Sequence, residues 1–221
     1  IRGSNRIVRT VRAQYVDPLS QIWLNAARAI GLQVERGDDV FATTDGVGGM
    51  RLGATATLDP DDSTAQMIFH ELCHALVAGP SSFAAADWGM DNQSDRDFSI
   101  EHACLRTQAV LAARYGLRSV FAPTTDFRAF WDALPADPLA DRRDPTVVSA
   151  IRALARVATA PWHPHLTEAL AATQALARVV DATRTADGHA TERGERAALP
   201  SLWASVEPPP APHPSGQQGA A

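Results

Sequence analysis

Hydrophobic residues follow a helical period over much of this chain. Between residues 18 and 30 apolar side chains recur every three or four positions, and Gly31 ends the pattern. The same spacing predicts later helices over residues 63–78, 100–115, 125–134, 145–159 and 164–184. Three strands are predicted before the second helix, over residues 32–35, 40–44 and 50–58. The sequence therefore predicts an α+β fold, in which a small N-terminal sheet precedes a mostly helical lobe.

These elements predict one domain followed by a tail. Residues 1–185 form the domain, with an α/β lobe over 1–80 and a helical lobe over 81–185. From residue 186 the chain turns polar and then proline-rich, a composition that cannot bury a core of its own. We therefore expect residues 186–221 to be disordered or to lie against a partner.

Composition narrows the possible functions. The chain has 221 residues, of which 45% are hydrophobic, and a net charge of −5. This length and apolar content suit one globular domain or two closely packed lobes. All 20 basic residues are arginine, and they form no basic cluster, so nucleic-acid binding is not indicated. No apolar run approaches the length of a membrane-spanning helix, so we expect no membrane span.

A histidine motif lies within the second predicted helix. Residues His70-Glu71-Leu72-Cys73-His74 have the pattern H-E-x-x-H. Residues four positions apart lie on one face of a helix, so the two imidazoles can share one metal ion. The apolar residues of this helix lie on the opposite face, which indicates a buried back and a polar front. The alternative is a pair of ordinary histidines on a surface helix.

The motif resembles that of the zincin metallopeptidases. Glu101 follows His74 by 27 residues, in the first turn of the next predicted helix, and this arrangement is similar to the gluzincin group. The likeness covers the motif and this helix, and more loosely residues 18–115. It implies one Zn²⁺ bound by His70, His74 and Glu101, with Glu71 as the general base that takes a proton from water.

The third ligand has alternatives, and the resemblance has departures. No third histidine follows the motif at the spacing of the H-E-x-x-H-x-x-G-x-x-H variant, and Leu105 stands where many gluzincins carry an acid. Glu101 itself is also consistent with a simple acid at a helix N-terminus. The other candidates for the third ligand are His102, Asp87, Asp91 and Asp97.

The resemblance also predicts where a substrate would bind. In zincins an edge strand next to the motif helix usually pairs with the substrate backbone. Here residues 50–58 precede the motif helix and are the predicted edge strand. We therefore expect a peptide or protein substrate.

The two cysteines flank the predicted metal site. Cys73 lies inside the motif, and Cys104 lies three residues after Glu101. If both helices face the metal, the two thiols are placed to form a Cys73–Cys104 disulfide, worth roughly 3–4 kcal/mol. The alternative is two buried free thiols. A disulfide would indicate an extracytoplasmic location, and free thiols a cytoplasmic one.

The expected function is therefore zinc-dependent peptide hydrolysis. Enzymes of this kind usually add a donor for the developing oxyanion. The candidate donors are His102, Tyr115, His163 and His165. Two other functions remain open: a non-catalytic zincin-like subunit that binds a protein partner through its termini, and a hydrolase acting on a non-peptide amide.

Overall fold

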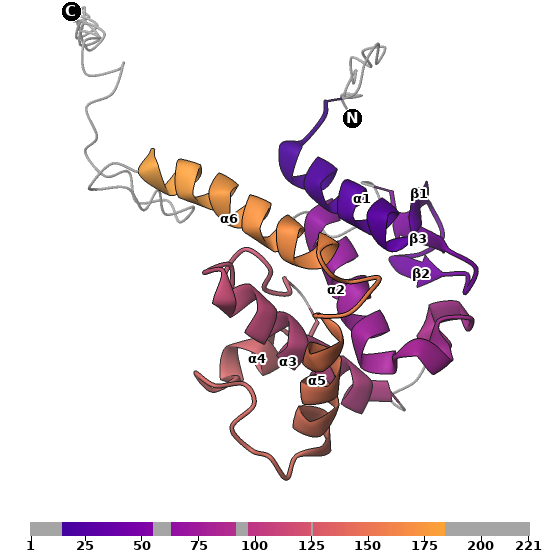
Figure 1. The fold of residues 1–221 in the computed structure, drawn as a ribbon, viewed down its shortest axis with the longest axis vertical. Helices are drawn as coiled ribbons and strands as arrows, with labels where there is room; N and C mark the ends of the chain where they lie inside the picture. Colours follow the sequence, from indigo (N-terminus) through magenta and orange to yellow (C-terminus); the bar gives the residue numbers. More distant parts are fainter. Residues whose placement is uncertain (1–14, 55–62, 92–96, 125, 184–221) are drawn as a thin grey trace, which may run out of the picture. The chain divides into compact units, whose positions relative to one another are not determined.

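A computed structural model describes residues 15–54, 63–91, 97–124 and 126–183 (Figure 1). These residues belong to one unit, residues 1–183, and residues 184–221 form a second unit. The predictions for residues 55–58 and for the tail at 186–221 lie outside the described residues. Within the described part of the chain the fold is α+β, with a small sheet and mostly helical content.

Six α-helices lie within the described residues. They are α1 (Pro18–Ile30), α2 (Thr64–Ala78), α3 (Phe98–Arg114), α4 (Arg128–Ala133), α5 (Pro145–Arg156) and α6 (His165–Ala182). Two short 3₁₀ helices, η1 (Pro80–Ser82) and η2 (Ala86–Gly89), follow α2. Local sequence explains the ends of the motif helix: the side chain of Ser63 accepts a hydrogen bond from the backbone N–H of Gln66, and Gly79 ends the helix.

The sheet has three strands, and the strand predicted at its edge lies in its centre. Strands β1 (Gln33–Gly37), β2 (Ala42–Thr44) and β3 (Gly49–Gly53) form a sheet in the order β1-β3-β2. β3 pairs in parallel with β1 and antiparallel with β2. The prediction that residues 50–58 form the edge strand was therefore wrong, because both sides of β3 are paired. The edge strands are β1 and β2.

The motif helix α2 lies at the centre of the hydrophobic core. It packs against α1, α3 and α5, and in Figure 1 it lies between the sheet and the α3–α5 group. Trp23 of α1, Phe69 of α2 and Phe121 form an aromatic cluster with ring centroids 4.7–5.3 Å apart. Trp23 also donates a hydrogen bond to Thr173 of α6, 3.0 Å long. Because α2 is enclosed in this way, its polar front has a fixed position.

A half-buried arginine holds α3 against the start of α5. Arg106 donates hydrogen bonds to the Thr146 hydroxyl, the Pro138 carbonyl and the Asp144 carboxylate, at 2.7–2.9 Å. Asp144 also caps α5 by accepting from the backbone N–H of Thr146. Burial alone would raise the pKa of Asp144, but the hydrogen bonds from Thr146 and the charge of Arg106 lower it overall. The carboxylate is thus an ionised anchor between the two helices.

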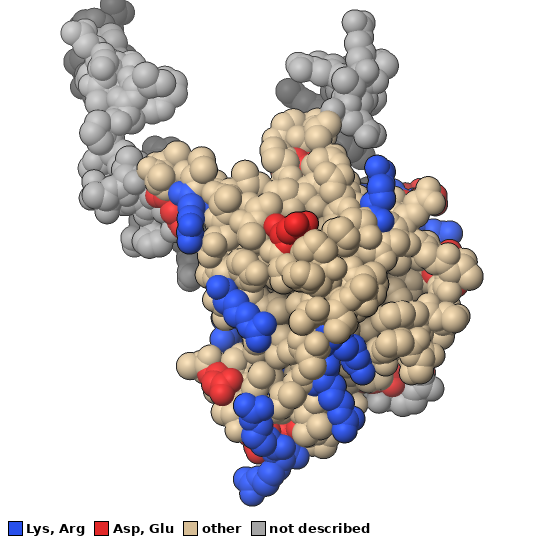
Figure 2. All heavy atoms as spheres, in the orientation of Figure 1, with Lys and Arg blue, Asp and Glu red and all other residues tan. Residues whose placement is uncertain are grey.

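The face seen in Figure 2 carries both arginine and acidic side chains. Arginine side chains are distributed over the visible face, with acidic residues between them (Figure 2). No described helix is both long enough and apolar enough to cross a membrane.

Candidate metal centre

Three side chains from α2 and α3 converge at one point. The Nε2 atoms of His70 and His74 lie 2.9 Å apart. Glu101 Oε1 lies 3.2 Å from His74 Nε2, and Glu101 Oε2 lies 3.6 Å from His70 Nε2. Ligand atoms about 2.0–2.1 Å from a tetrahedral zinc ion would be about 3.3 Å from one another. The three observed distances bracket that value.

The hydrogen bonds within this group do not satisfy all of its buried polar atoms. Side chains of His74 and Glu101 are 2% and 20% exposed. Among the described residues, Glu101 Oε2 and His74 Nδ1 are buried atoms without a hydrogen-bond partner. A buried carboxylate oxygen left unpaired is costly, and a metal ion would satisfy it. The donor set of two imidazoles and one carboxylate therefore suits a divalent cation.

The protonation states also suit metal binding. Burial alone would raise the pKa of Glu101, but the hydrogen bond from His74 lowers it overall, so the carboxylate is ionised. Burial, followed by the charge of His74, lowers the pKa of His70, so this ring is neutral near pH 7. For His74 burial lowers the pKa, but the hydrogen bond to Glu101 outweighs it and the net shift is upward. Metal binding would displace that proton.

Cys104 offers a second possible ligand. His70, His74 and Cys104 form a group whose ligand atoms lie within 4.8 Å of one another, and this group could hold a metal ion. Cys104 Sγ lies 3.8 Å from His70 Nδ1, the ring nitrogen that does not face His74, and 3.6 Å from the His70 carbonyl. Burial and a hydrogen bond with Cys73 raise the pKa of Cys104 well above its ordinary value. Without metal it is therefore a thiol, and a metal ion bound there would have to displace its proton.

The predicted disulfide is not present. Cys73 and Cys104 are both free and buried. Cys104 directs its sulfur toward the carbonyl and the imidazole of His70, so it contacts the motif helix through hydrogen bonds and not through a covalent bond.

A cleft opens in front of the three converging side chains. Its volume is about 550 Å³, and Glu71 lines it together with His70, His74 and Glu101. Strand β2 and the segment before it form one wall, and Pro123, Thr124, Asp126 and Phe127 contribute to the lining as well. The cleft thus combines a candidate metal centre, a further carboxylate and a strand edge.

Glu71 is held by a residue that sequence reasoning did not single out. Trp88 Nε1 donates a 3.3 Å hydrogen bond to Glu71 Oε2. Trp88 and its neighbour Asp87 both adopt left-handed backbone conformations, with φ of 56° and 49°. Asp87 in turn accepts hydrogen bonds from the Thr43 hydroxyl and the Thr44 N–H of β2, at 2.6 and 2.9 Å. This Asp87–Trp88 corner therefore links Glu71 to the edge strand.

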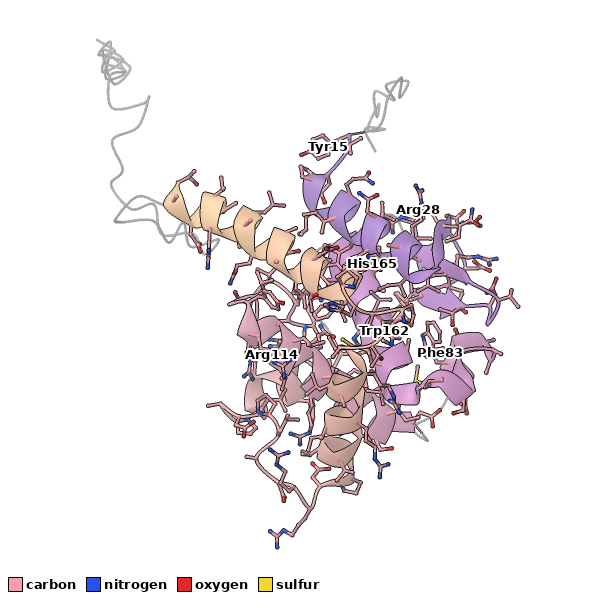
Figure 3. All side chains as sticks on the ribbon, in the orientation of Figure 1. Tyr15, Arg28, Phe83, Arg114, Trp162 and His165 are labelled. Atoms are coloured by element: carbon pink, nitrogen blue, oxygen red, sulfur yellow. The ribbon has the colours of Figure 1, made fainter. Side chains whose placement is uncertain are left out.

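The remaining predicted residues lie elsewhere. His102 stacks on Phe130 with ring centroids 3.9 Å apart, and the ring does not line the cleft. Tyr115 follows α3, and His163 precedes α6. His165, which is labelled in Figure 3, is the first residue of α6. None of these four candidate donors is among the cleft-lining residues.

The acidic alternatives for the third ligand have other partners. Asp87 lines the cleft, but its Oδ1 is bound to β2. Asp97 accepts a 2.6 Å hydrogen bond from the backbone N–H of Asp91. The structure therefore brings Glu101, and none of these aspartates, against both motif histidines.

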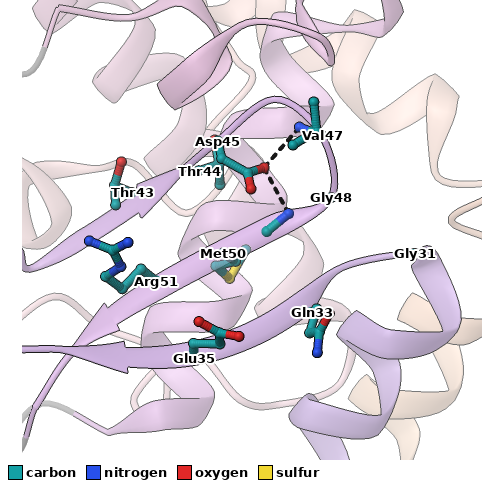
Figure 4. A pocket seen from close by; sticks show the side chains of 11 residues that line it. Gly31, Gln33, Glu35, Thr43, Thr44, Asp45, Val47, Gly48, Met50 and Arg51 are labelled. Atoms are coloured by element: carbon teal, nitrogen blue, oxygen red, sulfur yellow. Dashed lines mark hydrogen bonds between the residues drawn. The ribbon is translucent and has the colours of Figure 1, made fainter.

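A second large cavity lies over the sheet. It has a volume of about 540 Å³, and its polar lining includes Glu35 and Arg51 (Figure 4). Its most constrained acid, Asp45, accepts hydrogen bonds of 2.8 Å from the backbone N–H groups of Val47 and Gly49. These bonds lower the pKa of Asp45 and close the turn between β2 and β3. The carboxylate of Asp45 therefore stabilises the turn between β2 and β3.

Fold and site together define an α+β protein with a candidate metal centre on a buried helix. No protein-family model, no curated protein and no solved structure matches the chain. Any more specific function must therefore come from the chemistry of the cleft.

Proposed function

We propose that this protein is a zinc-dependent metallopeptidase, in which His70, His74 and Glu101 hold one Zn²⁺ and Glu71 is the general base. The observation that carries the proposal is the convergence of the three ligand groups, at 2.9–3.6 Å, in a cleft that Glu71 also lines. Glu101 is preferred to Cys104 because it approaches the Nε2 atoms of both histidines and is ionised.

Each residue has a separate task in this proposal. A bound zinc ion supplies Lewis acidity, which activates water and polarises a carbonyl. Glu71 accepts the proton of the attacking water and delivers it to the leaving amine. Trp88 holds one oxygen of Glu71 by its indole N–H, which leaves the other oxygen for that proton transfer.

The edge of β2 provides a way to bind a peptide. Phe41 C=O and Asp45 N–H are bonded to β3, so along this antiparallel strand the N–H and C=O of Ala42 point away from β3. Ala42 belongs to the wall of the cleft. A substrate segment can therefore pair with β2 as an added strand, the role that the sequence had suggested for residues 50–58. Asp87 limits this pairing at one end, because it occupies the N–H of Thr44.

The donor set leaves the metal to be determined by measurement. Two histidines and one carboxylate with open positions bind catalytic zinc, and they also bind ferrous iron in oxygenases. The metal content of the purified protein is therefore the first measurement. About one zinc per chain is expected, and one iron per chain in place of zinc would overturn the proposal.

Cleavage of a peptide library by the full chain is the second measurement. Wild type and the Glu71→Gln variant should bind equal zinc, and cleavage by the variant should fall at least about a hundredfold, because general-base catalysis contributes that much. Glu168→Gln, on the surface of α6, is the matched control and should cleave like wild type. Zinc binding without cleavage of any peptide would instead favour the non-catalytic subunit.

A further inference from the structure

Gln108 of α3 lies behind the candidate metal centre and contacts one of its ligands. Its side chain is buried, and its Oε1 lies 2.9 Å from His70 Nδ1. Its Nε2 donates a 2.6 Å hydrogen bond to the backbone carbonyl of Phe121. The amide is therefore held at both ends, by a backbone group on one side and by a motif histidine on the other.

These two contacts determine the tautomer of His70. A backbone carbonyl can only accept a hydrogen bond, so the amide nitrogen of Gln108 must face Phe121 and the amide oxygen must face His70. An amide oxygen also only accepts, so the proton between Gln108 and His70 must be on Nδ1. A neutral imidazole has a single N–H, and here it is the one that donates to Gln108. Its Nε2 therefore carries the lone pair.

The position of this lone pair decides between the two possible third ligands, Glu101 and Cys104. His70 Nε2 lies close to His74 and Glu101, whereas the sulfur of Cys104 lies 3.8 Å from the protonated Nδ1. A nitrogen that carries a proton cannot bind a metal. The orientation of the Gln108 amide thus excludes a metal on the Cys104 side of the ring.

We infer that Gln108 is a positioning residue, which fixes His70 in the Nδ1–H tautomer and so directs its metal-binding nitrogen toward His74 and Glu101. This inference rests on the metal centre of the proposed function. It does not depend on peptide cleavage, because the hydrogen bonds that carry it exist in the protein without metal.

The tautomer can be measured directly. The full chain is labelled with ¹⁵N-histidine and freed of metal with a chelator, and long-range ¹H–¹⁵N spectra are recorded near neutral pH. The His70 signals are assigned with the His70→Gln variant. We expect a neutral ring protonated on Nδ1. A ring protonated on Nε2 would overturn the inference, and this result is independent of whether the protein cleaves peptides.

Two variants separate positioning from folding. Gln108→Met fills the same space without an acceptor, and it should lose the Nδ1–H tautomer and weaken zinc binding by about 10–100-fold. Gln108→Glu keeps an oxygen acceptor facing His70. It replaces the amide nitrogen with a second oxygen, which would lie against the Phe121 carbonyl and repel it. It should therefore unfold at a lower temperature while keeping the Nδ1–H tautomer and near-wild-type zinc affinity.

A matched control removes a similar bond elsewhere. Gln174 donates a 2.7 Å hydrogen bond to the Tyr115 carbonyl, which is not part of the motif. Gln174→Met should lose stability but keep wild-type zinc affinity, measured by competition with a chromogenic chelator. If Gln108→Met binds zinc as tightly as Gln174→Met, the positioning role of Gln108 is wrong.

Discussion

In the proposed zinc site, replacing Glu101 with glutamine should remove most of the stabilisation that a bound zinc ion would give to the fold. The substitution keeps the shape of a side chain that is 20% exposed, but it removes the negative charge 3.2 Å from His74 Nε2. At a free zinc concentration 100 times its Kd, binding stabilises wild type by about 2.7 kcal/mol. For a domain of this size each kcal/mol raises Tm by about 2–4 °C. Zinc should therefore raise the Tm of wild type by about 5–11 °C.

The variant should respond far less to the same zinc concentration. Loss of a ligand should cost at least the roughly 100-fold in affinity that loss of a supporting contact can cost. Zinc would then be near its Kd, where it contributes only about 0.4 kcal/mol, or about 1–2 °C.

Thermal unfolding with added zinc or with chelator measures both values. Glu168→Gln serves as a control for the removal of one carboxylate, and it should respond like wild type. Cys104→Ser should also keep most of the response, because Cys104 lies on the Nδ1 side of His70. A full response in Glu101→Gln together with a lost response in Cys104→Ser would refute the proposed ligand set and favour the cysteine.

Three further outcomes follow from contacts around the site and in the core. Trp88→Phe should keep its zinc but lower kcat about tenfold or more, because a hydrogen bond to a charged group is worth about 1.5–3 kcal/mol. An unchanged kcat would rule out a role for the indole N–H in holding Glu71. Trp23→Phe should lower the free energy of unfolding by about 1–3 kcal/mol in denaturant titration, because it removes the hydrogen bond to Thr173. A loss under about 0.5 kcal/mol would contradict this. Asp144 has a lowered pKa in the folded state, so its contribution is full above the ordinary aspartate value of about 3.9 and is lost as pH falls through the lowered value. The Tm of Asp144→Asn should therefore fall less steeply in acid than that of wild type, and equal slopes would show that this carboxylate is not involved.

Local sequence was sufficient for the features that depend on neighbouring residues. The motif helix was predicted over residues 63–78 and is observed as Thr64–Ala78, because a serine cap and a terminal glycine are local signals. The position of Glu101 relative to His102 also followed from helix geometry: adjacent residues point about 100° apart, and the structure turns the first toward the histidines and the second onto Phe130.

Features that depend on distant partners could not be predicted in this way. The alternation of residues 50–53 indicates a strand, but not that β1 would pair with it in parallel and leave β2 at the edge. The contact of Trp88 with Glu71 depends on two consecutive left-handed residues, neither of which is a glycine. Such conformations are set by tertiary contacts against local preference, so the sequence around them carries no signal.

The Asp87–Trp88 corner has a consequence for how the protein would open. Each left-handed non-glycine residue costs about 1–3 kcal/mol, which the hydrogen bonds to β2 and to Glu71 must offset. The corner lies in a segment of short 3₁₀ helices, whereas the proposed metal ligands lie on long α-helices of the core. The least costly fluctuation of this region is therefore a local opening that frees Glu71 and the edge strand together while the ligands stay in place. Amide exchange should therefore be faster at the corner than in the motif helix. In the locally opened state the protein would still hold the metal, but Glu71 would no longer be positioned for catalysis.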